Sequence, residues 1–166
     1  GACGCEANTG DRAGILIQIP HDFFVAEAAR LGFKLPAIGH YGVGQMFLPQ
    51  VAEHREAVKT AFAKLAAAEG QTLLGWRDVP VNNSSLGKTA VKVEPFMAQV
   101  FIGRSASMQD EAAFERRLYI IRKLAEQQVH YANSVPGGDW LYISSLSART
   151  IPYKGMLMSE QVEKFY

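Results

Sequence analysis

The chain has 166 residues, of which 48% are hydrophobic and 20% charged, and its formal net charge at pH 7 is +1. This length suffices for one domain with a buried core, and we expect a single domain segment over 1–166. The small charge gives no reason to expect nucleic acid or an anionic membrane as a partner, and no apolar run is long enough for a bilayer-spanning helix.

The opening residues 1–20 combine two thiols, a polar turn at 8–11 and an apolar strand, and they contain no initiating Met. This start predicts a chain that begins in mid-domain. Cys3 and Cys5 are too close for an unstrained disulfide, and their spacing differs from that of common zinc knuckles. We therefore expect two reduced thiols, since a reactive nucleophile requires a neighbouring base that the local sequence does not show.

The first third of the chain predicts a strand over 15–19, buried on both faces and stopped by Pro20. A helix should follow, with Asp22 as its N-cap and Gly32 at its end. Its apolar positions should be Phe23, Phe24, Ala28 and Leu31. The loop at 36–44 contains glycines but lacks the spacing and the lysine of a phosphate-binding loop, which argues against a nucleotide site.

A second strand is expected over 42–48 and a long helix over 51–69, closed by Gly70. One face of this helix should be buried through Val51, Val58, Phe62 and Leu65. Residues 72–81 read as a third strand, in which we expect Trp76 in the core and Arg77 facing solvent.

The second half predicts a turn at 82–87 and one or two strands over 91–102, with a bulge or a sheet edge at Pro95. A helix should run over 110–131, starting at a capping box that opens with Ser107. Its buried positions should be Phe114, Leu118, Ile121 and Ala125.

Two strands are expected at 140–147 and 150–154, paired as a hairpin, and a final helix over 160–166 capped by Ser159. Helices alternate with strand pairs that lie close together in sequence. This order favours a layered arrangement with antiparallel pairs over a doubly wound parallel sheet.

The polar residues offer little chemistry by spacing alone. The four histidines are dispersed, so each is interpreted as a cap, surface or satisfied half-buried residue: His21, His40, His54 and His130. The hydroxyl residues near the end of the chain lack a Gly-x-Ser-x-Gly elbow and read as strand and turn positions: Ser144, Ser145, Ser147 and Thr150.

Several stretches spread over the chain form a recognisable series: 1–11 (GACGCEANTGD), 14–21 (GILIQIPH), 75–81 (GWRDVPV), 94–95 (EP), 99–102 (QVFI), 116–119 (RRLY), 142–147 (YISSLS) and 153–156 (YKGM). Together they resemble the glutaminase domain at the N-terminus of the glutamate synthase large subunit, a class II glutamine amidotransferase. The resemblance covers essentially the whole chain in the family's order.

The resemblance implies an α+β fold, the N-terminal-nucleophile hydrolase αββα four-layer sandwich, incomplete in this chain. It implies hydrolysis of L-glutamine to glutamate and ammonia by an N-terminal Cys whose own α-amino group is the base. The ammonia would pass to a synthase domain of the same polypeptide, which aminates and reduces 2-oxoglutarate with FMN, an iron–sulfur cluster and electrons from ferredoxin or NAD(P)H. A cytoplasmic enzyme is expected, or a plastid one in a photosynthetic eukaryote.

The same resemblance places no catalytic residue, metal ligand or cofactor site in this chain. The nucleophile lies upstream, and the Arg, Asn-Gly and Asp that bind substrate and form the oxyanion hole lie downstream. Gly1 matches the last residue of a His-Arg-Gly motif and is the one candidate for a position beside the glutamine pocket. Arg12 stands where the family generally has Gly, which would strain a backbone with φ above zero. We expect the 166-residue chain alone to be inactive.

Two alternatives stay open. The chain could belong to a class II amidotransferase with another acceptor, which a downstream flavin barrel and cluster cysteines would exclude. It could also be a catalytically dead binding or scaffold module of the same fold, which predicts a complete gene without the N-terminal Cys.

Overall fold

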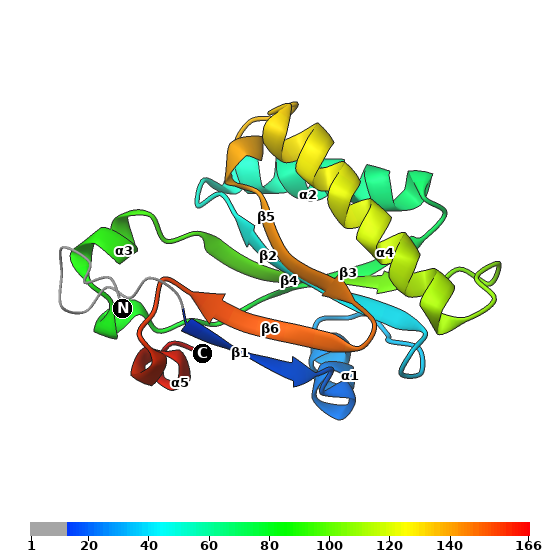
Figure 1. Cartoon of the computed structure of the whole chain (residues 1–166), viewed down its shortest axis with the longest axis horizontal. Coiled ribbons are helices and arrows are strands. Elements are labelled where there is room, and N and C mark those ends of the chain that lie inside the picture. The colour runs from blue at the N-terminus through cyan, green and yellow to red at the C-terminus, as the bar shows by residue number, and fades with distance from the viewer. Residues whose placement is uncertain (1–12) are drawn as a thin grey trace.

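A computed structural model describes residues 13–166, and within them the strands form two antiparallel sheets (Figure 1). The larger sheet has four strands in the order β3-β4-β2-β5, and the smaller sheet pairs β1 with β6. The larger sheet comprises β2 (Tyr41–Leu48), β3 (Thr72–Asp78), β4 (Phe96–Gly103) and β5 (Tyr142–Ser147); the smaller comprises β1 (Ala13–Gln18) and β6 (Thr150–Gly155).

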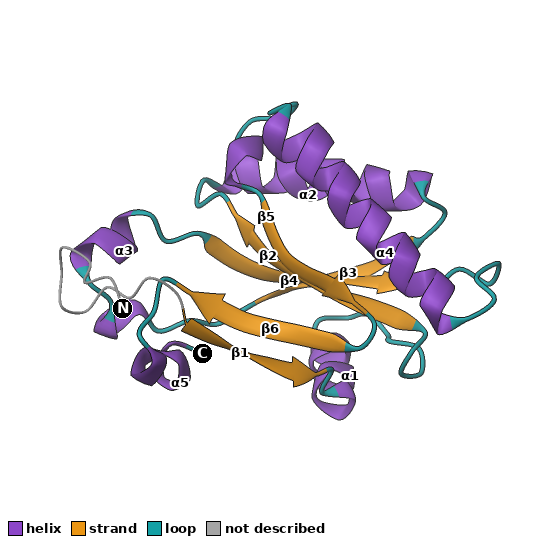
Figure 2. Ribbon diagram, in the orientation of Figure 1, coloured by secondary structure: helices purple, strands orange, loops and turns teal. Residues whose placement is uncertain are grey.

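Two long helices cover one face of the four-stranded sheet (Figure 2). They are α2 (Ala52–Ala68) and α4 (Glu111–Ala125), and a π-helical segment, Glu126–Tyr131, continues α4. The predicted stripe of α4 is fully buried, as are Val58 and Phe62 of α2, and all of them pack on apolar side chains of the sheet. This is the largest core of the described residues, and it is apolar because each helix turns one stripe toward the strands.

The two-stranded sheet lies against the opposite face of the larger sheet, with α1 (His21–Arg30) beside it. The core between the sheets is rich in aromatic residues. Phe101 of β4 lies in it with ring centroids 5.2 Å from Phe24, 5.4 Å from Phe33 and 6.3 Å from Tyr41. A buried aromatic cluster therefore joins the two sheets to α1.

Short helices gather at one end of the molecule (Figure 1). They are α3 (Lys88–Lys92), α5 (Val162–Phe165) and the 3₁₀ turns Asn83–Ser85 and Ser159–Gln161, while a further 3₁₀ turn, Gly138–Trp140, precedes β5. A third cluster packs Phe165 and Leu157 against Val79 and Met97. No helix within residues 13–166 is long and apolar enough to cross a membrane.

The predicted ends of the first two helices are confirmed by backbone geometry. Gly32 and Gly70 follow α1 and α2 with φ of +85° and +73°, a conformation that side chains with a Cβ rarely adopt. The helix over 110–131 is likewise confirmed.

The prediction that the first strand is buried on both faces is wrong for the described residues. Ile15 is 53% exposed and Leu16 67% exposed. Leu16 lies on the outer face of the narrow β1–β6 sheet, whereas Ile15, on the same face as Ile17, borders an open cavity. The apolar run reflected one buried face, shown by Ile17 and Ile19 in the inter-sheet core.

Two predictions about strands in the second half are also wrong. Residues 88–92 form α3, and β4 begins directly after Pro95, so the proline marks a strand start in a central strand rather than a bulge or an edge. The strands at 142–147 and 150–155 do not form a hairpin, because β5 pairs with β2 and β6 pairs with β1. The buried Ala148 lies where the chain crosses from one sheet to the other.

Three predicted helix caps are wrong. Asp22 lies inside α1, which starts after Pro20 without a side-chain cap. Asp110, not Ser107, caps α4 by accepting a hydrogen bond of 2.6 Å from the Ala113 amide. Ser159 lies inside the 3₁₀ turn before α5, and Gln161 precedes that helix without a side-chain cap hydrogen bond.

Val51 is also misassigned, since it is 54% exposed and stands just before α2 rather than on its buried stripe. Phe23 and Leu31, expected among the apolar positions of α1, are 46% and 40% exposed. Val51 and Leu31 flank their helices, and Phe23 lies beside the buried stripe of α1 that Phe24 and Ala28 form rather than on it.

Candidate functional site

A row of polar side chains crosses the inter-sheet face of the larger sheet. Arg77 pairs in register with Gln99, Gln99 with Gln45, and Gln45 with Ser145, so the row spans all four strands. Gln45 and Gln99 are fully buried and Arg77 is 6% exposed. Buried polar groups of this kind are retained in a core when they are hydrogen-bonded to one another.

Hydrogen bonds connect most of this row. The Arg77 guanidinium donates through Nη1 to Gln99 Oε1 at 3.1 Å. The Gln99 amide Nε2 then donates to Gln45 Oε1 and to the Tyr153 hydroxyl, both at 3.0 Å. Tyr153 comes from β6, so the row links the two sheets.

Glu27 of α1 supplies the charge that balances Arg77. Its Oε2 accepts from Arg77 Nε at 2.8 Å, and its Oε1 accepts from Arg30 Nε at 3.0 Å. Hydrogen bonds from Arg30 and then from Arg77 lower the pKa of Glu27 to about 2. A carboxylate held by two guanidinium groups therefore stays ionised well into the acid range.

We expect Glu27→Gln to change the acid sensitivity of folding. The native pKa of about 2 lies below the ordinary value of 4.5, so the ionised carboxylate stabilises the fold above pH 4.5. This contribution is lost as the pH falls from 4.5 toward 2. The stability difference between wild type and Glu27→Gln should shrink across that window, as measured by denaturant unfolding at each pH.

The matched control is Glu53→Gln, which changes an exposed glutamate of α2. It should leave the acid dependence of the wild type unchanged. A difference between wild type and Glu27→Gln that stays constant from neutral pH to pH 2 would contradict the assignment.

A cavity of about 480 Å³ opens beside this row, between β1 and α5. Its walls are mainly apolar, and Arg77 and Tyr153 contribute polar atoms to it. The lining residues are Ile15, Ile17, Phe23, Arg77, Val79, Pro80, Tyr153, Ser159, Val162, Glu163 and Tyr166. A mainly apolar hollow with few polar groups is typical of ligand sites.

Burial keeps two tyrosines, Tyr41 and Tyr166, protonated. It raises the pKa of Tyr41 to about 12 and also raises that of Tyr166. Tyr41 can therefore donate to His21 Nδ1, which lies 3.0 Å from its hydroxyl oxygen. Tyr166 donates to the Lys154 carbonyl oxygen at 2.6 Å.

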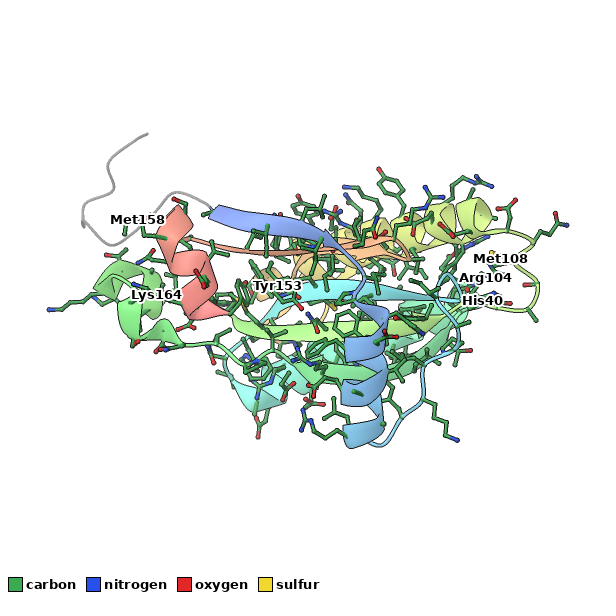
Figure 3. The ribbon with its side chains drawn as sticks, turned by 90° about the horizontal axis from the view of Figure 1, so that it is seen from below. His40, Arg104, Met108, Tyr153, Met158 and Lys164 are labelled. Atoms are coloured by element: carbon green, nitrogen blue, oxygen red, sulfur yellow. The ribbon has the colours of Figure 1, made fainter. Side chains whose placement is uncertain are left out.

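The histidines do not converge on the cavity. In Figure 3, Tyr153 lies near the middle of the molecule and Lys164 lies on α5, whereas His40 lies at the opposite end beside Arg104. The ring of His130 meets that of Tyr131 edge to face with centroids 4.7 Å apart, and its Nδ1 is buried without a hydrogen-bond partner among the described residues. His130 is therefore not a satisfied half-buried histidine, one of the roles expected for the four.

The prediction that Arg77 faces solvent is wrong. The Trp76 ring packs at 6.0 Å from that of Phe62 on the helix side of β3, and Arg77 consequently points into the space between the sheets. Trp76 and Arg77 do point to opposite faces of β3, as predicted. Arg77 is nevertheless buried, because both faces of the strand are covered. Ser144, Ser145, Ser147 and Thr150 lie on strands, as expected.

Sequence reasoning missed the other members of the row. Gln45 and Gln99 each interrupt an otherwise apolar strand, YGVGQMFL and FMAQVFIG, and such an interruption could have marked them. The sequence offers no comparable signal for Glu27, because glutamate is common at exposed helix positions and its burial here cannot be read from its residue type. Gly1, Cys3, Cys5, the turn at 8–11 and Arg12 lie outside the described residues, so their predictions stay predictions.

The side-chain hydrogen bonds of Arg77 and Gln99 go to Glu27, Gln45, Tyr153 and each other, so the geometry of the row alone identifies no reaction. A comparison of the sequence with known families decides the relationship. The family model described as class-II glutamine amidotransferases matches residues 1–166. The chain belongs to this family.

Curated relatives of this amidotransferase chain are glutamate synthases. It is 45% identical over 166 residues to the glutamate synthase [NADPH] large chain of Bacillus subtilis. It is 40% identical to the chloroplastic ferredoxin-dependent glutamate synthase of Oryza sativa and 36% identical to glutamate synthase [NADH] of Schizosaccharomyces pombe. All of the chain is matched in each case, and it spans 10%, 10% and 8% of these relatives.

Proposed function

We propose that the chain is part of the glutaminase domain of a glutamate synthase, which hydrolyses L-glutamine to glutamate and ammonia. The observation that carries this proposal is the match of the complete chain to glutamate synthases with three different electron donors, at 36–45% identity. A class II amidotransferase with another acceptor is a less economical reading, because these relatives share one overall reaction by name.

The proposed reaction is acyl transfer at a cysteine. The thiolate of an N-terminal Cys attacks the side-chain amide carbon of glutamine, the carbon–nitrogen bond breaks, and ammonia leaves with the proton taken up by the α-amino base. Water then cleaves the thioester and releases glutamate. These groups come from residues outside this chain, whereas Gly1 is proposed to border the glutamine pocket.

The role proposed for residues 1–166 is that of a partial domain scaffold. Helices α2 and α4, the four-stranded sheet and the β1–β6 sheet would be three layers of an αββα sandwich of the N-terminal-nucleophile hydrolase type. The fourth layer would cover the outer face of β1–β6, where Leu16 is exposed. The polar row through Arg77 would then hold the two central sheets in a single relative position.

The proposed partners belong to the complete enzyme. Ammonia would pass to the synthase domain, which combines it with 2-oxoglutarate using FMN, an iron–sulfur cluster and electrons from ferredoxin or NAD(P)H. Residues 13–166 contain no cysteine and no group of three or more His, Cys, Asp or Glu side chains able to hold a metal ion. These residues therefore do not fit a cluster site. We propose a cytoplasmic location, or a plastid one.

The test is a glutaminase assay on the complete polypeptide that contains this chain, with its N-terminal Cys changed to Ala as the control. We expect ammonia release from L-glutamine in the wild type and none in the Cys→Ala variant. Formation of glutamate that depends on 2-oxoglutarate would then assign the glutamate synthase reaction. Hydrolysis without that dependence would favour another acceptor, and no hydrolysis would favour a dead scaffold.

A second arm tests the role of the chain itself. The 166-residue chain alone should release no ammonia from glutamine, because the proposal assigns the attacking thiol and its base to residues outside it. Turnover by this chain would overturn the assignment of the reacting groups to residues outside it.

A further inference from the structure

The polar row on the larger sheet ends in two buried atoms with no hydrogen-bond partner among the described residues. They are Gln45 Nε2 and Ser145 Oγ. The two residues are register partners on β2 and β5, and their side chains therefore lie on the same face of neighbouring strands. Two adjacent polar groups, rather than one isolated group, are left to be satisfied at this end of the row.

The orientation of the free Gln45 nitrogen follows from Arg77. A guanidinium group only donates, so the atom of Gln99 that it contacts is the amide oxygen. The amide nitrogen of Gln99 then faces Gln45 and requires an acceptor there, which is Gln45 Oε1. The Gln45 nitrogen is consequently turned away from the row, and it presents an N–H donor to whatever lies beyond.

The backbone is irregular at the same place. The β2–β5 register shifts between Gln45 and Met46, so that Ser144 is an extra residue opposite them. The Ser144 hydroxyl donates to the Gln45 main-chain oxygen at 3.1 Å. A bulge changes the direction of neighbouring side chains, and Gln45 Nε2 and Ser145 Oγ make no hydrogen bond with each other.

We propose that one water molecule binds between Gln45 and Ser145. It accepts the N–H of Gln45 Nε2 and exchanges a second hydrogen bond with Ser145 Oγ, which can donate or accept. Buried water of this kind occurs where enclosed polar groups of a protein have no other partner. The bound water extends the row from the Arg77 charge on β3 to the edge strand β5, joining all four strands through hydrogen bonds.

The experiment is a crystal structure of the complete polypeptide that contains this chain, at a resolution that shows ordered water. We expect a single density peak within hydrogen-bond distance of Gln45 Nε2 and Ser145 Oγ. Ser145→Val, which fills the position with two methyl groups and removes the hydroxyl, should abolish the peak. Ser144→Ala is the matched control, because it removes the neighbouring hydroxyl and should keep the peak.

Other outcomes overturn the proposal. A direct hydrogen bond between Gln45 Nε2 and Ser145 Oγ would leave no place for water, and a protein oxygen from another segment in contact with both atoms would identify a different occupant. Persistence of the peak in Ser145→Val would also contradict the site. If Ser145→Val does not fold, the wild-type density and the Ser144→Ala structure still decide between these outcomes.

Discussion

Replacing Phe101 by alanine should destabilise the protein by about 3–5 kcal/mol, the usual cost of removing a large aromatic side chain from a packed core. Phe101 is fully buried, and its ring packs against those of Phe24, Phe33 and Tyr41. These neighbours come from α1, the segment after it and β2. They cannot fill the space left by the Phe101 ring unless whole elements move. Denaturant unfolding of wild type and Phe101→Ala measures the difference.

Tyr119→Ala provides the control for this prediction. Tyr119 lies on α4 with 58% of its surface exposed, so the same kind of truncation removes little buried area. Its effect should stay within about 0.5 kcal/mol, as for most surface substitutions. Equal losses at the two positions would show that the inter-sheet cluster does not carry the stability assigned to it.

Replacing Arg77 by methionine should also cause a large loss, and for an electrostatic reason. The change keeps an unbranched side chain but removes the donor to Gln99 Oε1, which lies in a fully buried residue. An unsatisfied buried acceptor costs about 1–3 kcal/mol. The Glu27 carboxylate also loses one of its two guanidinium partners. The free energy of unfolding should therefore fall by more than the cost of the unsatisfied Gln99 acceptor alone.

The variant Arg30→Met distinguishes the effect of the exposed arginine partner of Glu27 from that of the buried partner, Arg77. The Arg30 side chain is 64% exposed, and a solvated ion pair contributes little to stability. We expect a much smaller loss than for Arg77→Met in the same unfolding experiment. A loss at Arg30 equal to that at Arg77 would mean that Glu27, and not the polar row, determines the effect.

The sequence by itself determined the family and much of the local structure. The motifs spread over 1–156 identified a class II amidotransferase, as the match over the whole chain confirms. Helix ends at Gly32 and Gly70 were predictable because a positive φ favours glycine. The buried stripe of α4 followed from helical periodicity, which depends only on residues close together in the chain.

Only the tertiary structure decided which strands pair and which charged groups are buried. The chain crosses between the two sheets at Ala148, so β5 and β6 separate although they are neighbours in sequence. Arg77 is buried because Glu27, fifty residues away in the chain, and Gln99 on the next strand satisfy it. Such contacts depend on how distant elements pack, and a buried arginine is stable only where that packing brings its partners together.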